Sequence, residues 1–321
     1  MIEAGPTLRT AGDTVDLSEP VIVGVVNATP DSFSDRGDRS TTGSIRQVSR
    51  HLEDGASIIE IGGESNVTNR PAVSASTEID RILPVVEAAV EAGATVSIDT
   101  YKPEVAAAAL DAGAAMVNDI SGSDSSGMIE LCADRGAAVV VMHTEVAPKS
   151  QIWDERLYPD GVTARQVSFF EARLAALAAA GVERDCVVID PGPDFAKTPR
   201  QTVDSLAGLP RLAALGCPIM LAVSRKDFVG AITGRRPGDR SGGTFGAIAA
   251  GLELGARLLR VHDVAGTSDF LRVWQAVNDP EAVSPQLRIS EEIRREPPAG
   301  SGPGETGAGR SGPSDRGSAI G

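Results

Sequence analysis

Short apolar runs alternate with longer amphipathic segments along most of this chain. Each short run is typical of a strand buried on both faces, and each longer segment carries apolar residues at helical spacing. The predicted strands cover residues 21–26, 57–61, 95–98, 115–117, 137–142, 186–189, 218–223 and 258–261. The predicted helices cover residues 44–54, 77–92, 102–112, 126–134, 163–180 and 202–215, a segment that ends near residue 255, and a last one that ends near residue 277.

Eight strand–helix repeats within residues 21–280 predict an α/β fold, the (β/α)8 or TIM barrel. A doubly wound open sheet is the rival fold, but it seldom reaches eight uninterrupted repeats, and the first turn lacks a glycine-rich dinucleotide fingerprint. Residues 1–20 are predicted as an N-terminal arm or a short hairpin across the barrel bottom. Residues 285–321 are rich in Gly, Pro and Ser, which predicts a disordered tail.

The composition and net charge of the chain argue against some classes of function. The 321 residues carry a net charge of -14, which argues against a nucleic-acid partner or an anionic membrane surface. No apolar segment reaches membrane-spanning length and no signal peptide is evident, so a cytoplasmic location is predicted. Three widely spaced cysteines in apolar surroundings, Cys132, Cys186 and Cys217, are typical of buried thiols.

Polar residues stand where the predicted strands end. Because the carboxyl ends of barrel strands meet at one mouth, these side chains are expected to face one cavity. The set is Asn27, Glu64, Asp99, Asn118, Asp190, Lys226, Arg260 and His262. The acceptors and the amide of Asp99, Asn118 and Asp190 suit a flat heterocycle with several N–H donors, and Lys226 could donate to a ring carbonyl or nitrogen.

A second subsite is expected beside the first. Arg260 and His262 belong to the eighth strand and Asn27 to the adjoining first strand. An arginine beside a histidine favours a phosphate-like anion. Asn27 is the candidate ligand of a Mg²⁺ ion bridging that anion, because magnesium prefers oxygen ligands.

Several of these residues also have purely structural interpretations. Asp190 could cap its own Asp-Pro-Gly loop, Lys226 could be a solvated lysine at a helix start, and Arg260 could pair only with Asp263. Asp99 and Asn118 could cap the helices that follow them. Of the remaining histidines, His143 is predicted to be packed at the barrel rim and His51 to lie on a helix surface.

The strand-end motifs, taken in order, resemble those of the dihydropteroate synthase family of pterin-binding barrels. The resemblance covers residues 21 to about 277. Its motifs are Asn27-Ala-Thr-Pro-Asp-Ser-Phe33, Gly62-Gly-Glu-Ser65, Ser97-Ile-Asp-Thr100, Asn118-Asp119, Met142-His143, Asp190-Pro-Gly192, Phe195-Ala-Lys197, Ser224-Arg-Lys226 and Arg260-Val-His-Asp263.

The resemblance implies condensation of 6-hydroxymethyl-7,8-dihydropterin pyrophosphate with 4-aminobenzoate, which yields 7,8-dihydropteroate and pyrophosphate in folate biosynthesis. It implies that Asp99, Asn118, Asp190 and Lys226 bind the pterin, with catalytic roles for Asp99, Asp190 and Lys226. It further implies that Asn27, Arg260 and His262 hold the pyrophosphate with Mg²⁺. Barrels of this family are generally dimers, so a homodimer is expected.

The acceptor pocket, expected at Asn66, Phe195, Ser224 and Arg225, departs from the family pattern. The family usually reads Glu-Ser-Thr-Arg-Pro-Gly in its second loop, whereas this chain has Glu64-Ser-Asn-Val-Thr-Asn69. The family commonly has Gly before the Phe of the sixth loop, and this chain has Asp194. A carboxylate there is expected to repel that of aminobenzoate by about 1 kcal/mol or more.

Two alternatives therefore stand beside a working synthase. One is a paralogue that binds pterin pyrophosphate but uses another acceptor, or that has only a binding or regulatory role. The other is a related barrel that transfers a methyl group from a methylated folate to a corrinoid protein, in which Arg260 and His262 would have no pyrophosphate to bind.

Overall fold

Eight parallel strands form the centre of the fold in a computed structural model, which describes residues 6–29, 40–65, 71–123, 126–150 and 152–295. The strands are β3 (Val21–Asn27), β4 (Ile58–Gly62), β5 (Thr95–Asp99), β6 (Met116–Asp119), β7 (Ala138–Met142), β8 (Val187–Asp190), β9 (Met220–Leu221) and β10 (Leu258–Val261). Their order in the sheet is β8-β7-β6-β5-β4-β3-β10-β9, and a parallel bridge between Ile189 and Ile219 joins the two ends. The predicted barrel is confirmed.

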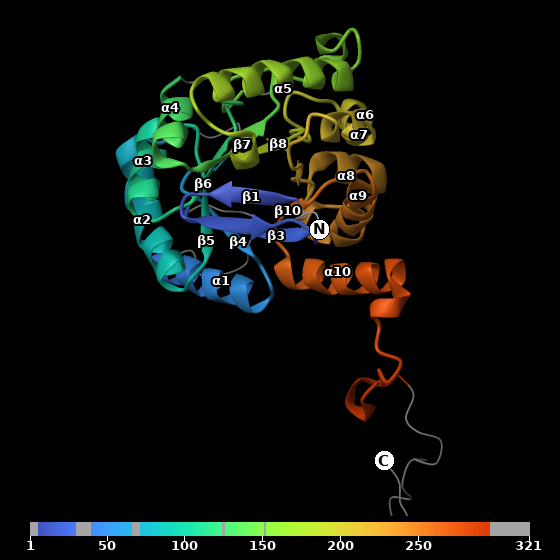
Figure 1. The fold of residues 1–321 in the computed structure, drawn as a ribbon. Coiled ribbons are helices and arrows are strands. Elements are labelled where there is room, and N and C mark those ends of the chain that lie inside the picture. Colours follow the sequence, from blue (N-terminus) through green and yellow to red (C-terminus); the bar gives the residue numbers. More distant parts are fainter. Residues whose placement is uncertain (1–5, 30–39, 66–70, 124–125, 151, 296–321) are drawn as a thin grey trace, which may run out of the picture. The chain divides into compact units, whose positions relative to one another are not determined.

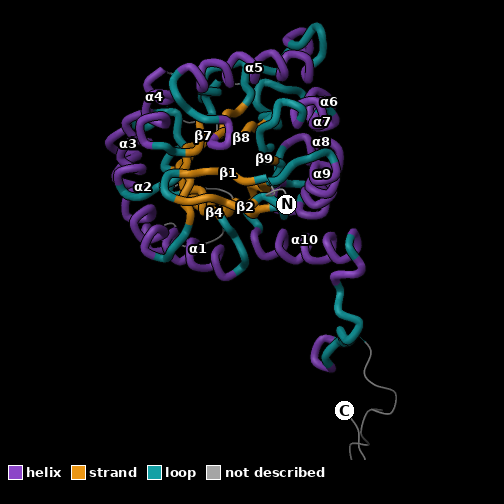
Figure 2. Tube along the Cα trace, viewed as in Figure 1, coloured by secondary structure: helices purple, strands orange, loops and turns teal. Residues whose placement is uncertain are grey.

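Helices follow the strands and surround them (Figures 1 and 2). They are α1 (Thr41–Glu53), α2 (Ala75–Glu91), α3 (Pro103–Asp111), α4 (Ser126–Arg135), α5 (Val162–Ala179), α6 (Pro199–Ala207), α7 (Leu209–Ala213), α8 (Asp227–Thr233), α9 (Ser241–Glu253) and α10 (Val264–Asn278). The single helix predicted for residues 202–215 is wrong. It is two helices, α6 and α7, because Gly208 and Pro210 interrupt the helical run.

The barrel interior has an apolar layer below a polar layer. Side chains two residues apart on a strand point to the same side. A strand with an apolar residue pointing inward can therefore carry an inward polar residue two positions later. The pairs are Ile58 and Glu60 on β4, Met116 and Asn118 on β6, Val188 and Asp190 on β8, and Leu258 and Arg260 on β10. This alternation places the polar residues toward the carboxyl ends of the strands.

An N-terminal hairpin completes the apolar layer. Strands β1 (Thr7–Thr10) and β2 (Asp13–Asp16) pair antiparallel, and Leu8 and Leu17 are fully buried in one cluster with inward residues of the barrel strands. The backbone N–H of Ala11 donates to the carbonyl of Ala115, immediately before β6. The hairpin therefore covers the end of the barrel opposite the polar layer.

Residues 275–321 form a second compact unit. Within it, the described part after α10 contains two short 3-10 turns, Pro280–Ala282 and Glu291–Ile293. The predicted disordered tail falls mainly on residues 296–321, which lie outside the described residues. Among the described residues, no helix is both long and apolar enough to cross a membrane.

Two predictions about titratable side chains have clear outcomes. The three cysteines are buried and unbonded to one another, as predicted. The prediction that His51 lies on a surface is wrong, because His51 is 7% exposed and its Nε2 lies 3.1 Å from the carbonyl oxygen of Val25. The His51 ring therefore joins α1 to β3, although the helical spacing of the sequence predicted it to be exposed to solvent.

Candidate active site

A network of four polar side chains crosses the barrel mouth. Arg260 donates from Nε to a carboxylate oxygen of Glu60 and from Nη2 to Asp99 at 2.8 Å. Asn118 donates from Nδ2 to the other oxygen of Glu60 at 3.0 Å. Glu60 has no exposed surface and Asp99 is 8% exposed. The structure thus brings Asp99, Asn118 and Arg260 into one hydrogen-bonded group, centred on a glutamate that the sequence analysis did not select.

One cation in this network faces two carboxylates. Burial by itself would lower the pKa of Arg260, but the carboxylates of Glu60 and Asp99 raise it above its ordinary value. Asp263 has a different role from the one considered above, since its carboxylate accepts from the N–H of Gly266 in the first turn of α10. The interpretation of Arg260 as a partner of Asp263 alone is therefore wrong.

The sequence around Glu60 could have identified it as a buried polar residue of the barrel interior. It is a charged residue inside the run Ile58-Ile59-Glu60-Ile61, where both neighbours face the helices outside the barrel. A carboxylate there must point inward and needs donors. The sequence analysis considered only residues at strand ends and therefore missed it.

Asn118 retains an amide oxygen that the described residues do not satisfy. Its Oδ1 is buried and has no hydrogen-bond partner among the described residues. A buried amide oxygen without a donor is costly unless a ligand or water supplies one. An N–H donor on a flat heterocycle would satisfy it.

Asp190 lies on the same inward layer at the end of β8. It is 2% exposed, and its Oδ1 accepts the N–H of Gly192 at 2.7 Å. Asp190 therefore does cap its own loop, as the structural interpretation expected. Burial raises the pKa of Asp190, while the Gly192 amide and the charges of Lys226 and Arg260 act in the opposite direction.

Lys226 stands immediately before α8, with its Nζ 4.4 Å from the centre of the Phe195 ring. The two residues come from different loops, one after β9 and one after β8. Burial lowers the pKa of Lys226, and Asp194 and Asp190 partly offset that effect. Lys226 and Phe195 thus form one cation–aromatic pair at the mouth.

His262 and Ser224 form a second pair beside Arg260. The Ser224 hydroxyl lies 3.0 Å from Nδ1 of His262 and accepts the backbone N–H of His262. Burial lowers the pKa of His262 to about 3, and the cations Arg260, Arg225 and Lys226 act in the same direction. The imidazole is therefore neutral at physiological pH, in surroundings whose positive charges would attract an anion. Asn27, at the end of β3, is partly exposed and pairs with Gly62 of β4.

Lys197 is a fully buried lysine that supports the loop after β8. Its Nζ donates to the carbonyls of Gly192 and Phe195 at 3.0 Å each and to that of His143 at 3.3 Å. Burial lowers the pKa of Lys197 to about 7. His143 is packed as predicted, fully buried with its ring edge-on to Phe169 at 4.9 Å.

Glu64 of the second loop binds lysines. It pairs with Lys102 at 2.5 Å and with Lys149 at 3.3 Å, and is 7% exposed. Burial would raise the pKa of Glu64, but the two lysines lower it below its ordinary value. Asn66 and the rest of the altered loop, residues 66–70, lie outside the described residues.

Asp194 has backbone and hydroxyl partners that the sequence did not indicate. Its carboxylate accepts the N–H groups of Asp227 and Phe228 at the start of α8 and the hydroxyl of Thr202. The carboxylate is therefore engaged within the protein. Repulsion of an aminobenzoate carboxylate stays a prediction.

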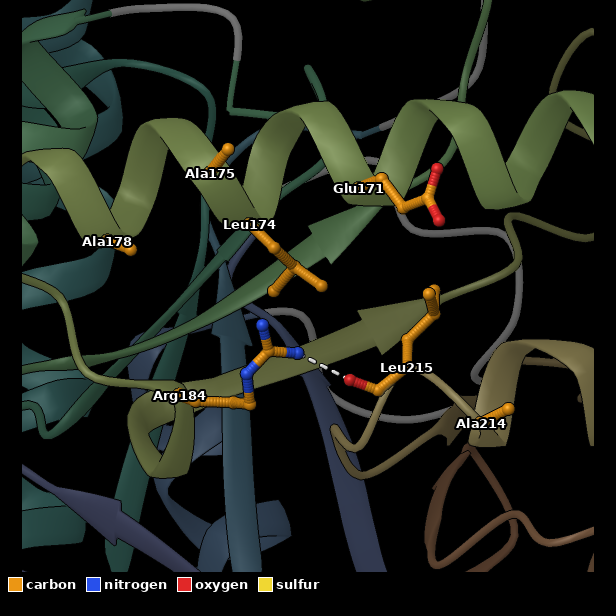
Figure 3. A pocket seen from close by; sticks show the side chains of 7 residues that line it. All are labelled: Glu171, Leu174, Ala175, Ala178, Arg184, Ala214 and Leu215. Carbon is orange, nitrogen blue, oxygen red and sulfur yellow. Dashed lines mark hydrogen bonds between the residues drawn. The ribbon is translucent and has the colours of Figure 1, made fainter.

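A groove on the outside of the barrel is unrelated to these residues. It lies beside α5 and is lined by seven residues, among which Arg184 donates to the carbonyl of Leu215 (Figure 3). Arg184 precedes β8 and Leu215 precedes β9, so the groove lies toward the amino ends of these strands. The polar residues of the mouth are at the other end.

Metal ligands are sparse in the part of the chain that the structure describes. It contains no group of three His, Cys, Asp or Glu side chains placed to hold a metal ion.

Known proteins resemble this chain over most of its length. The pterin binding enzyme family matches residues 23–262. Dihydropteroate synthases are similar at 39% identity in Streptococcus pyogenes, over 78% of this chain and 93% of that protein, and at 33% in Escherichia coli, over 84% and 95%. The structure of dihydropteroate synthase from Xanthomonas albilineans with 4-aminobenzoic acid is 39% identical, with a TM-score of 0.79 over 87% of this chain and all of that one.

The same Xanthomonas enzyme with 7,8-dihydropteroate superposes with a TM-score of 0.76. The Thermus thermophilus enzyme in complex with 6HMPPP is 34% identical and superposes with a TM-score of 0.72, over 84% of this chain and 99% of that one. Family match, relatives and fold agree. The chain therefore belongs to the family of pterin-binding enzymes that includes the dihydropteroate synthases.

Proposed function

We propose that this protein is a transferase that condenses 6-hydroxymethyl-7,8-dihydropterin pyrophosphate with 4-aminobenzoate to give 7,8-dihydropteroate and pyrophosphate. The main support is the polar layer at the mouth of a barrel whose relatives have been solved with 4-aminobenzoic acid, 6HMPPP and 7,8-dihydropteroate. In the reaction the bond between the pterin methylene carbon and the pyrophosphate oxygen breaks. A bond from that carbon to the amine nitrogen forms, and the nitrogen loses a proton.

The pterin ring is assigned to Asp99, Asn118, Asp190 and Lys226. The orphan amide oxygen of Asn118 and the buried carboxyl of Asp190 offer acceptors to ring N–H groups, and Lys226 offers a donor. As pyrophosphate leaves, positive charge develops on the methylene and ring, and Asp99 and Asp190 stabilise it. No strong base is required, because an aniline nitrogen is uncharged at neutral pH.

The leaving group is assigned to the corner formed by Arg260, His262 and Asn27. The Arg260 guanidinium is held by Glu60 and Asp99 and is 17% exposed, so it can face an anion without moving. The neutral imidazole of His262 is positioned by Ser224 to donate a hydrogen bond to a phosphate oxygen. Mg²⁺, with Asn27 as its protein ligand, would neutralise charge on the departing pyrophosphate.

The acceptor is assigned to the neighbourhood of Phe195, Ser224, Arg225 and Asn66. Phe195 stacks against Lys226, next to the proposed pterin site. An aromatic ring beside a cation suits a benzoate, whose ring and carboxylate can each find a partner.

The test is a pyrophosphate-release assay with the purified protein. Release should require both pterin pyrophosphate and 4-aminobenzoate, should stop when Mg²⁺ is chelated, and should be accompanied by dihydropteroate formation. The gene should also rescue folate synthesis in a strain that lacks its own enzyme. Pterin binding without turnover would favour a paralogue with another acceptor or a binding role. Methyl transfer from a methylated folate would favour the corrinoid-linked reading.

We also propose a cytoplasmic homodimer. Large apolar side chains remain exposed on the barrel unit, including Ile232 on α8 at 67% and Val273 on α10 at 65%. Covering such side chains in a second copy would stabilise association. Sedimentation equilibrium of the purified protein should give twice the chain mass, and a monomer at micromolar concentration would contradict the dimer.

A further inference from the structure

Asp194 has an unusual backbone for a residue with a side chain. Its φ is 66°, in the left-handed region, and that of Ala196 is 49°. Aspartate tolerates this region better than most residues, but it still carries a cost that bonding must offset. The backbone N–H of Asp194 donates to the Thr202 hydroxyl at 3.2 Å, and that hydroxyl donates to the Asp194 carboxylate at 3.3 Å. The turn is therefore held at both its backbone and its side chain.

The Asp194 carboxylate links this turn to the next loop. It accepts the N–H of Asp227 at 2.6 Å and that of Phe228 at 3.3 Å, the first two residues of α8. Lys226, the residue in the capping position of α8, makes no capping hydrogen bond with its own side chain. Asp194 thus supplies from the loop after β8 the cap that α8 lacks.

The opposite side of the same segment is held by an arginine. Arg240 donates from Nη1 to the carbonyls of Arg225 and Lys226, at 2.8 and 3.1 Å. Arg240 therefore binds the carbonyls of Arg225 and Lys226, while Asp194 binds the amides of Asp227 and Phe228. This fixes where the lysine side chain begins.

The side chain is fixed by the loop that carries Asp194. Phe195, the next residue, provides the ring over which the Lys226 ammonium lies at 4.4 Å. The Asp194 charge also acts on that ammonium and raises its pKa against the lowering effect of burial. One two-residue segment, Asp194-Phe195, thus holds the Lys226 ammonium and raises its pKa.

We propose that Asp194 is a positioning residue of this chain, whose carboxylate binds the first amides of α8 and thereby holds Lys226 over Phe195, at the pterin site. The proposal rests on the proposed function in its assignment of Lys226 to the pterin. It assigns to Asp194 a role through Lys226, without contact to either substrate.

The test is binding of 6-hydroxymethyl-7,8-dihydropterin pyrophosphate across pH, measured by fluorescence titration of wild type and Asp194→Asn. Asparagine keeps the shape and tolerates a positive φ but lacks the charge. The variant should bind roughly three- to tenfold more weakly at neutral pH. Its binding should also fail at lower pH than that of wild type, because Lys226 loses its proton earlier without the neighbouring carboxylate.

Two matched variants separate positioning from general effects. Thr202→Val removes the hydroxyl that braces Asp194 and leaves every charge in place, so it should lower the melting temperature without moving the pH limit of binding. Asp204→Asn makes the same charge change on the surface of α6, where Asp204 pairs with Arg200, and should alter neither. If Asp194→Asn does not fold, Asp194→Gly removes the carboxylate with no strain at this φ and is titrated instead.

Hydrogen exchange distinguishes failure of this inference from failure of the proposed function. Loss of the carboxylate should speed exchange in peptides covering residues 225–230, whether or not the protein binds a pterin. A wild type that does not bind pterin pyrophosphate, with faster exchange in the variant, would count against the proposed function alone. Unchanged exchange together with an unchanged pH limit would overturn the role of Asp194.

Discussion

Glu60 is a carboxylate with no exposed surface, and two hydrogen-bond donors offset the cost of burying its charge. Arg260 and Asn118 occupy its two oxygens, and Arg260 is in turn shared with Asp99. Buried charges of this kind are stable only as a group, because each partner compensates the desolvation of the next. At the scale of single residues, the mouth is thus a set of mutually dependent charges.

Replacing Glu60 by Gln should therefore be costly. The amide would still accept from Asn118 but would leave the charge of Arg260 with Asp99 alone. We expect a loss of about 1–3 kcal/mol in the free energy of unfolding, because the amide NH2 would face the Arg260 Nε–H and leave a buried donor without an acceptor. Urea denaturation measures it. Glu183→Gln, which touches only the exposed pair with Arg9, should cost about 0–1 kcal/mol; equal losses would contradict the buried role.

Asp190→Asn should weaken pterin binding. It retains the size of the side chain and can still accept the Gly192 amide, but it no longer offers a carboxylate to ring N–H groups. The expected loss is about 1.5–3 kcal/mol, roughly ten- to a hundredfold in the dissociation constant. Calorimetric titration with pterin pyrophosphate measures it, with exposed Asp185→Asn as the control. Unchanged affinity would remove Asp190 from the site.

Lys197 should make stability depend on pH. Unfolded, its pKa is near 10.5, and in the folded protein burial lowers the pKa to about 7, with Asp190 and Glu145 raising it and Lys226 lowering it. Between these values the unfolded chain binds more protons, so the contribution of Lys197 to stability rises with pH across this window, by up to about 1.4 kcal/mol per pH unit. Below pH 7 it is constant.

The measurement is urea unfolding of wild type and Lys197→Met at several pH values between 7 and 10. The variant loses the hydrogen bonds from the Lys197 side chain to backbone carbonyls and should be less stable throughout. The gap between the two proteins should widen as pH rises. A gap independent of pH would show that Lys197 titrates alike in both states.

At the scale of elements, the loops after β8 and β9 are more ordered than their sequence suggests. The loop after β8 contains Gly192 and Lys197, and its carbonyls converge on the Lys197 ammonium. Helix α6 then begins at Pro199, three residues before the predicted start, because Thr198 and Gln201 form a capping box. Helix α8 was not predicted at all. It is seven residues long, and its first amides depend on Asp194 from another loop.

Gly192 should be irreplaceable in this loop. Its φ is 63°, and an added Cβ would lie 2.2 Å from the backbone carbonyl oxygen of His143, which cannot move without disturbing β7. Gly192→Ala should therefore cost several kcal/mol, where a positive φ alone costs about 1–2 kcal/mol. Gly216→Ala is the matched control, since its φ is 75° and a Cβ there meets nothing within 4 Å. Thermal unfolding compares them; similar losses would show that the contact is unimportant.

At the scale of the whole molecule, one end of the barrel is sealed and the other carries the polar layer. The hairpin of β1 and β2 inserts Leu8 and Leu17 beneath the inward residues of the strands. Since the interior is packed below, substrates can reach the polar layer only from the carboxyl ends of the strands.

Leu8→Ala should destabilise the barrel from its closed end. The side chain is fully buried, so we expect a loss of about 2–5 kcal/mol in the free energy of unfolding. Leu287→Ala, at a side chain that is 69% exposed, should change it by less than about 0.5 kcal/mol. Pterin affinity should be the same in all three proteins below their melting temperatures. A small effect of Leu8→Ala would mean that the hairpin is a dispensable arm.

Much of the fold could be predicted because strand and helix periods are local. The eight apolar runs and the amphipathic segments between them define a barrel, and the barrel alone places strand-end residues such as Asp99 and Asp190 at a common mouth. Boundaries of helices were less predictable. Gly208, between α6 and α7, lies so close to α5 that an added Cβ would meet Thr163 at 2.2 Å, and no local pattern reports that contact.

The sequence by itself thus determined the barrel, the end of the barrel at which polar groups gather, and the family that the chain resembles. Repeats and motifs can be recognised from residues close together in the sequence. Only the tertiary structure decided which charges meet. It joined Arg260 to Glu60 across two hundred positions of sequence, buried His51 against β3, and turned Asp194 toward α8. Pairing of this kind depends on through-space distance and on desolvation, and neither can be read from neighbouring residues.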